Sequence, residues 1–185
     1  LGIYCKGAVF MYVKKDARWK TLQDFVQEAK ERQLTASSSG MLNHTHFVAA
    51  ALTKMAGIKL AHVPYKSCGE SVTALLGGHA DADFCQSSMG QVEAGAVRIL
   101  AVADYERPKI NPDVKTFKEL GYPVALPLYY SFCVPAKTPK NVIDILGNGM
   151  QEVFKRYGKE VQEELTRVEF IPTFFDVQQS IQEFK

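Results

Sequence analysis

Short β-prone runs alternate with amphipathic segments from residue 8 to residue 103, and most of these runs lead into a polar loop rich in serine or glycine. This alternation is typical of a sheet with parallel neighbours, because a crossover helix returns the chain to the starting end of the sheet. The sequence therefore predicts an α/β fold, with parallel-rich sheets flanked by helices.

Hydrophobic periodicity predicts the individual elements. The expected strands cover 8–13, 34–37, 59–63, 80–85, 97–103, 129–134 and 168–171. The expected helices cover 21–29, 43–55, 67–76, 87–94, 116–121, 138–157 and 159–167, with a last helix capped by Thr173. Ser67 with Glu70, and Thr116 with Glu119, have the spacing of capping boxes, and Gly57 stands where a glycine ends a helix.

The composition excludes several classes of protein. The chain has 185 residues, of which 46% are hydrophobic and 23% charged, as in a globular protein. A net charge of +2 argues against a nucleic-acid partner. No apolar run reaches the roughly 18 residues that span a bilayer. Leu1 begins no recognisable signal peptide, so we expect a processed or incomplete chain.

The four cysteines show no metal-binding or redox motif. They stand at 5, 68, 85 and 133, without a Cys-x-x-Cys pair. Two disulfides are arithmetically possible, but the wide spacing favours isolated small apolar residues. No cofactor and no metal are expected.

Three loops that follow predicted strands combine polar side chains with a helix N-terminus. They begin at Ser37, at Pro64 and at Cys85, and the third includes Gln86, Ser87 and Ser88. In an open α/β sheet, ligands bind beyond the carboxyl ends of the strands. Unpaired N–H groups and the helix dipole favour an anion there. The alternative is that these are ordinary capped loops without a ligand.

Catalytic interpretations have less support. A serine at 37–39 could be a nucleophile only with a positioned base, and no Gly-x-Ser-x-Gly elbow is present. His44 and His46 lie on different helix faces and are poor joint metal ligands, with His46 expected in the core. Asp81 and Asp83 share one strand face, which we interpret as partly exposed to solvent. We expect a binding protein and not an enzyme.

Seven segments, taken in order, resemble the substrate-binding receptors of the tripartite tricarboxylate transporter family, also called Bug receptors. The segments are Thr21 to Phe25, Ser38 to Gly40 with His46 and Phe47, His62 to Lys66, Leu75 to Asp81, Glu93 to Val102, Thr116 to Gly121, and Pro135 to Pro139. The resemblance extends over nearly the whole chain.

This resemblance implies a type II periplasmic-binding-protein-like fold of two lobes, with domain 1 incomplete. Residues 14–127 would form domain 2, and 1–13 with 128–185 the hinge and part of domain 1. The protein would be a periplasmic or extracytoplasmic monomer that captures a small carboxylate for the subunits of a membrane permease. Alternatives are the effector domain of a transcriptional regulator with the same two-lobe fold, or a fragment that has lost binding.

The resemblance and the loop pattern together indicate the ligand-binding residues. They are Ser37, Ser38, Ser39, Gly40, Asn43, Thr45, Tyr65, Lys66 and Gln86, with most weight on Ser38, Ser39 and Gly40. Several positions depart from the family pattern, among them Ser37 for a glycine and Met41-Leu42-Asn43 for Asn-Gly-Ser. We therefore expect a donor set that differs from that of citrate receptors and suits a bulkier or more apolar ligand.

Overall fold

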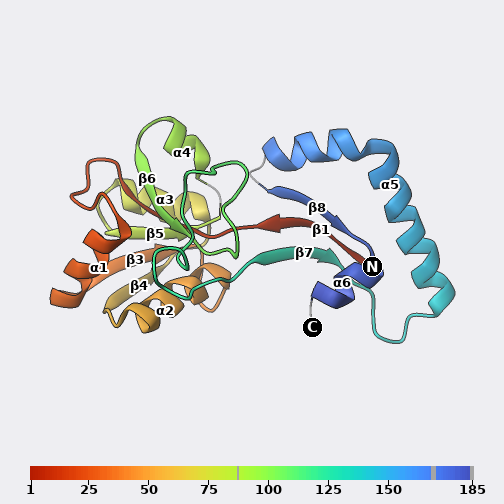
Figure 1. Ribbon diagram of the computed structural model, residues 1–185, viewed down its shortest axis with the longest axis horizontal. Coiled ribbons are helices and arrows are strands. Elements are labelled where there is room, and N and C mark those ends of the chain that lie inside the picture. Colours follow the sequence, from red (N-terminus) through yellow and green to blue (C-terminus); the bar gives the residue numbers. More distant parts are fainter. Residues whose placement is uncertain (87, 168–169, 184–185) are drawn as a thin grey trace. The chain divides into compact units, whose positions relative to one another are not determined.

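The computed structural model describes residues 1–86, 88–167 and 170–183 and divides into two compact units (Figure 1). The larger unit is Ala8–Pro127, and the smaller combines Leu1–Gly7 with Leu128–Lys185. The first boundary lies six residues before the one expected at 13/14, because the strand around Met11 belongs to the sheet of the larger unit. None of the helices in the described ranges is long and apolar enough to cross a membrane.

The larger unit is built on a mixed five-stranded sheet. Its strands are β2 (Phe10–Lys14), β3 (Leu34–Ser38), β4 (Leu60–Pro64), β5 (Ala82–Cys85) and β6 (Val97–Val102). They lie in the order β4-β3-β5-β2-β6, and β3 runs parallel to both of its neighbours. β2 is antiparallel to β5 and β6, so the parallel part is confined to three strands. The predicted α/β class is confirmed, with a mixed rather than uniformly parallel sheet.

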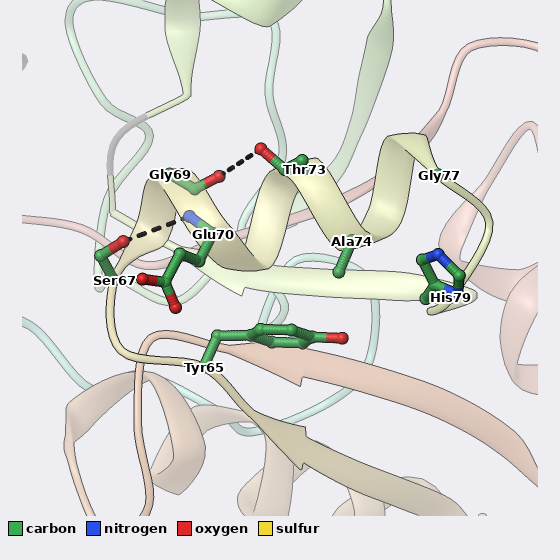
Figure 2. A pocket seen from close by; sticks show the side chains of 8 residues that line it. All are labelled: Tyr65, Ser67, Gly69, Glu70, Thr73, Ala74, Gly77 and His79. Carbon is green, nitrogen blue, oxygen red and sulfur yellow. Dashed lines mark hydrogen bonds between the residues drawn. The ribbon is translucent and has the colours of Figure 1, made fainter.

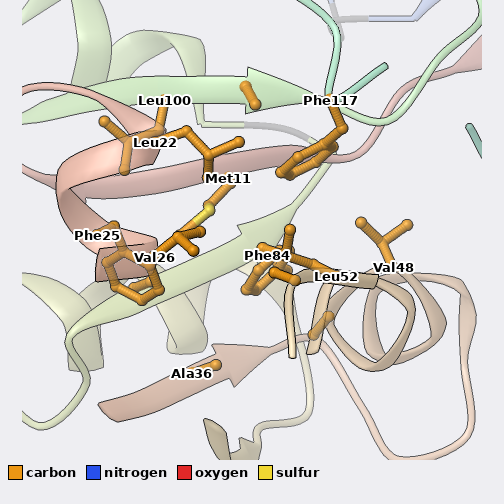
Figure 3. Close-up of a cluster of buried hydrophobic side chains, with 14 of the residues drawn as sticks. Met11, Leu22, Phe25, Val26, Ala36, Val48, Leu52, Phe84, Leu100 and Phe117 are labelled. Atoms are coloured by element: carbon orange, nitrogen blue, oxygen red, sulfur yellow. The ribbon is translucent and has the colours of Figure 1, made fainter. Parts of the chain in front are cut away.

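Helices cover both faces of this sheet. α1 (Leu22–Glu31) and α2 (His44–Ala56) pack over one face, and α3 (Cys68–Leu76) and α4 (Met89–Glu93) over the other. β2 is buried on both sides, with Met11 in the first cluster and Phe10 and Tyr12 in the second. Figure 3 shows Leu22, Phe25 and Val26 of α1 beside Met11, with α2 near Phe84. This alternation follows from the period of two along a strand.

The helix ends follow the expected capping chemistry in part. Thr21 and Asp24 form a reciprocal capping box at α1, and Gly57 ends α2 with φ of 62°. The Ser67 hydroxyl accepts from the N–H of Glu70, but the Glu70 carboxylate accepts from Lys66 and not from Ser67. Thr116 and Glu119 make both capping contacts, although the segment that follows forms turns and no regular helix.

The smaller unit contains a three-stranded antiparallel sheet in the order β7-β1-β8. Its elements are β1 (Gly2–Gly7), β7 (Leu128–Phe132), α5 (Lys140–Arg167), β8 (Ile171–Phe175) and α6 (Val177–Glu183). β1 was not predicted, and within α5 Tyr157 is non-helical, where two helices were expected to meet.

The prediction that Thr173 begins the last helix was wrong. Thr173 lies within β8, and the Asp176 carboxylate instead accepts from the N–H of Gln179 at the start of α6. The expected strand at 168–171 overlaps β8 only at Ile171, and 168–169 lie outside the described residues.

Two expectations about buried side chains were also wrong. Cys68 and Cys85 form a disulfide between the start of α3 and the end of β5, while Cys5 and Cys133 are free. Asp83 does not face solvent and is fully buried. Each result depends on the packing of α3 against β5, which brings together segments 17 residues apart.

Candidate functional site

The three loops singled out in the sequence emerge at one edge of the larger sheet. β4, β3 and β5 are mutually parallel, with Ser38 in register with Pro64 on one side and Phe84 on the other. The N–H of Tyr65 donates to the carbonyl of Ser38 at 2.9 Å, which joins the first loop to the second. Gln86 directly follows β5 and is half-buried. Ser87, also in the third loop, lies outside the described residues.

A closed ring of hydrogen bonds links three of the predicted site residues. The Thr45 hydroxyl donates to Asn43 Oδ1 at 2.8 Å, and Asn43 Nδ2 donates to Ser39 Oγ at 3.2 Å. Ser39 Oγ lies 3.1 Å from Thr45 Oγ1, and it donates there because the Thr45 proton is already used. Among the hydrogen bonds of the described residues, none uses the second Nδ2 proton of Asn43.

The N-terminus of α2 adds backbone donors beside this ring. Asn43 is the N-cap, and its Oδ1 accepts from the N–H of His46 at 3.1 Å. Among the hydrogen bonds of the described residues, none satisfies the N–H of His44 or Thr45, which occupy the first turn. Such donors, together with the positive end of the helix dipole, favour an anion.

Gly40 is required by close packing against Asn43. A Cβ at this position would stand 2.8 Å from Asn43 Nδ2, so a larger residue would displace the amide that donates to Ser39. The adjoining Met41 and Leu42 are 59% and 71% exposed. The exposed surface beside the donor ring is thus apolar.

The hydroxyls of Ser37 and Ser38 serve the interior of the unit. Both side chains are fully buried. Ser37 Oγ lies 2.8 Å from Asp83 Oδ1, and Ser38 Oγ donates to the carbonyl of Gly40 at 3.0 Å. The sequence pattern could not distinguish these two serines from Ser39, which is half-buried and lies on the donor ring.

Two histidines that the sequence analysis did not assign to the site lie against the first loop. His62 Nε2 is 2.6 Å from Ser38 Oγ, and the His62 ring stacks on His46 with centroids 4.0 Å apart and an interplanar angle of 8°. Burial, and secondarily the charge of His46, lower the pKa of His62 from its ordinary value. His46 was expected in the core but is half-buried beside the loop.

Tyr65 and Lys66 lie on the second loop beside an open cavity of about 720 Å³ along α3. Figure 2 shows the Tyr65 ring extending beneath the helix, with Glu70 near its base and His79 beyond its hydroxyl. Lys66 is exposed, and its N–H donates to Glu70 Oε2 at 3.1 Å. Tyr65 is therefore the predicted residue that borders both the loop cluster and this cavity.

Asp83 is a buried acid beneath the first loop. Burial raises its pKa from an ordinary 3.8 to about 6, against the opposing effect of hydrogen bonds led by the one from Ser37. Its Oδ2 atom has no hydrogen-bond partner among the described residues. No group of three or more His, Cys, Asp or Glu side chains in the described ranges is placed to hold a metal ion.

Comparison with known proteins identifies relatives of the chain. Residues 3–184 match the model of the tripartite tricarboxylate transporter family receptor, TctC. A UPF0065 protein of Cupriavidus necator is 27% identical over 175 residues, which are 93% of this chain and 53% of that protein. The chain thus spans about half the length of this relative.

Solved structures show the same fold. A protein of R. palustris with adipate superposes with a TM-score of 0.83 at 19% identity, covering 98% of this chain and 62% of that one. MatC from Rhodopseudomonas palustris, with bound malate, superposes with a TM-score of 0.76 at 20% identity, covering 92% of this chain and 59% of that one. At these identities the likeness establishes the fold, which is that of periplasmic solute-binding proteins. With the family match over almost its whole length, the chain belongs to the tripartite tricarboxylate transporter receptor family.

Proposed function

We propose that this chain forms the ligand-gripping part of a solute-binding receptor that captures a small carboxylate outside the cytoplasm. The observation that carries the proposal is the donor cluster of Ser39, Asn43 and Thr45 beside the unpaired N–H groups at the start of α2. Gly40, Tyr65, Lys66 and Gln86 complete the proposed contact set around it. Ser37 and Ser38 support this set from the interior.

The donor cluster suits a carboxylate because its groups are already oriented. The ring holds the Asn43 amide in place, so little side-chain freedom is lost when an anion binds. A carboxylate accepts several hydrogen bonds, and bonds to a charged acceptor are stronger than those between neutral groups. The adipate and malate bound to two structural relatives support a dicarboxylate as the ligand class.

Capture requires two lobes that close on the ligand. We assign the larger unit to domain 2 of the receptor, and the smaller unit to part of domain 1 with the hinge. Closure would be driven by contacts that only the closed state makes. The receptor would then deliver its ligand to a membrane permease of the same transport system, from the periplasm.

A serine hydrolase is the alternative that one contact favours, namely the 2.6 Å approach of Ser38 Oγ to His62 Nε2. The rest of the geometry opposes it. Ser38 is fully buried, and its proton is directed to the carbonyl of Gly40 and away from the histidine. A fluorophosphonate probe should therefore leave the protein unlabelled, and stoichiometric labelling of Ser38 would favour the hydrolase.

The main test is titration calorimetry with mono-, di- and tricarboxylates of different chain lengths. We expect a dicarboxylate to bind. The variant Ser39→Ala should weaken its binding by about tenfold, because it removes the acceptor that orients the Asn43 amide and so the effect of one hydrogen bond from that amide to a charged group. Thr166→Ala is the matched control, since this hydroxyl lies on α5 and donates only to the carbonyl of Gln162. Equal affinity of wild type and Ser39→Ala would refute the assigned site.

A further inference from the structure

The bend of residues 38–43, which carries the proposed anion site, lies against a pair of stacked imidazole rings. His62 comes from β4 and His46 from the first turn of α2, and their parallel rings lie 4.0 Å apart. Each ring makes one hydrogen bond to the bend, His62 to Ser38 and His46 to Leu42. The pair therefore holds the bend near both of its ends.

The direction of the first hydrogen bond follows from its partners. Ser38 Oγ lies 3.0 Å from the carbonyl oxygen of Gly40, which can only accept, so the hydroxyl proton is directed there. Ser38 Oγ must then accept from His62, whose Nε2 carries a hydrogen. The N–H of Gly40 also points to Ser38 Oγ at 3.4 Å. The position of Gly40 therefore depends, through Ser38, on the position of the His62 ring.

The second hydrogen bond fixes the orientation of the His46 ring. Its Nδ1 accepts from the N–H of Leu42 at 3.0 Å, so Nδ1 carries no hydrogen in this contact. Leu42 has φ of 56°, a left-handed conformation that is unfavourable for a residue with a side chain. The acceptor on His46 offsets part of this cost and holds the bend in shape.

We propose that His62 and His46 are positioning residues that hold residues 38–43 in the shape required to bind an anion. Neither ring needs to touch the ligand. His62 fixes Ser38 and Gly40, His46 fixes Leu42, and stacking keeps the two rings in register. The consequence for affinity rests on the proposed function, whereas the consequence for the shape of the bend does not.

The shape of the bend can be measured without a ligand. We expect His62→Leu to shift the amide resonance of Gly40 and to speed hydrogen exchange at Leu42 at least tenfold. His62→Gln should restore both signals towards wild type, because its side-chain amide places an N–H near the former Nε2. His46→Phe keeps a stacked ring but removes the acceptor of the Leu42 N–H. It should therefore also speed hydrogen exchange at Leu42 relative to wild type.

Binding gives the second readout, with adipate and malate as probes. His62→Leu should weaken binding of the acid that binds wild type by about tenfold, and His62→Gln by less than about threefold. Thr166→Ala is again the control, because its hydroxyl lies on α5 and donates to the carbonyl of Gln162, away from the stack and from the proposed contact set. The amide spectrum of β2 and β6 verifies that each variant is folded.

Two results would overturn the proposal. One is an unchanged Leu42 exchange rate in both folded His62→Leu and His46→Phe proteins. The other is a His62→Gln variant as impaired as His62→Leu, which would indicate a general packing role for the ring. Failure of wild type to bind either acid would count against the proposed function alone, since the amide measurements decide positioning separately.

Discussion

Breaking the bond between Cys68 and Cys85 should destabilise the larger unit substantially. The bond closes a loop with a sequence separation of 17, for which the chain-entropy relation gives about 3 kcal/mol at 25 °C. For a protein of this size, losing that much of the free energy of unfolding corresponds to a fall in Tm of about 6–12 °C. Because Cys85 is fully buried, the bond also lies within the packed region between α3 and the sheet.

The measurement is urea unfolding of the oxidised protein, the protein treated with a phosphine reductant, and the double variant Cys68→Ala/Cys85→Ala. Cys133→Ala is the control, since this cysteine is free and exposed. Mass spectrometry after alkylation gives the number of free thiols in each sample. If the oxidised and reduced proteins differed by less than about 1 kcal/mol in the free energy of unfolding, the loop-closure argument would fail.

Three further substitutions test single features of the structure. Because the pKa of Asp83 in the folded protein, about 6, lies above its ordinary 3.8, folding binds a proton, and this stabilisation is complete below about pH 4 and lost as pH rises through 6. In wild type, the free energy of unfolding should therefore fall by up to about 3 kcal/mol between pH 4 and 6, and in Asp83→Asn this fall should be absent. Urea titration at each pH measures it, and the same fall in the variant would exclude Asp83 as the cause. Gly40→Ala should displace the Asn43 amide and cost about 1 kcal/mol of helix capping together with most carboxylate affinity, and calorimetry showing wild-type affinity would contradict this. Gly57→Ala should cost about 1 kcal/mol through its φ of 62° alone, because a Cβ there meets no atom within 4 Å; an unchanged Tm would refute the backbone argument.

Much of the larger unit could be predicted because its signals are local. The helix start at Thr21 and the stop at Gly57 involve residues within one or two turns, and both stand as expected. The strand–loop–helix pattern also placed the first and second loops correctly, and these meet through the bond between Tyr65 and Ser38. The strand that was missed lies in the smaller unit, where β1 pairs with strands more than a hundred residues away.

The candidate site was predictable as a set of loops but not residue by residue. Ser39, Asn43 and Thr45 were three of the nine expected ligand-binding residues, and a ring of hydrogen bonds joins them. Ser37 and Ser38 are chemically the same as Ser39, and only their place in the strand makes them interior. His62 has no local pattern that indicates a partner, because its contacts come from β3 and α2.

The sequence by itself determined the elements whose stability depends on neighbours along the chain, together with the α/β class that their order implies. The tertiary structure alone decided the insertion of β2 between β5 and β6, the pairing of Cys68 with Cys85, the burial of Asp83 and the stacking of His46 on His62. Each of these depends on which surfaces pack together. Which surfaces pack together depends on the burial of the whole hydrophobic core. No short segment contributes enough to that burial for its packing partner to be predicted from the segment alone.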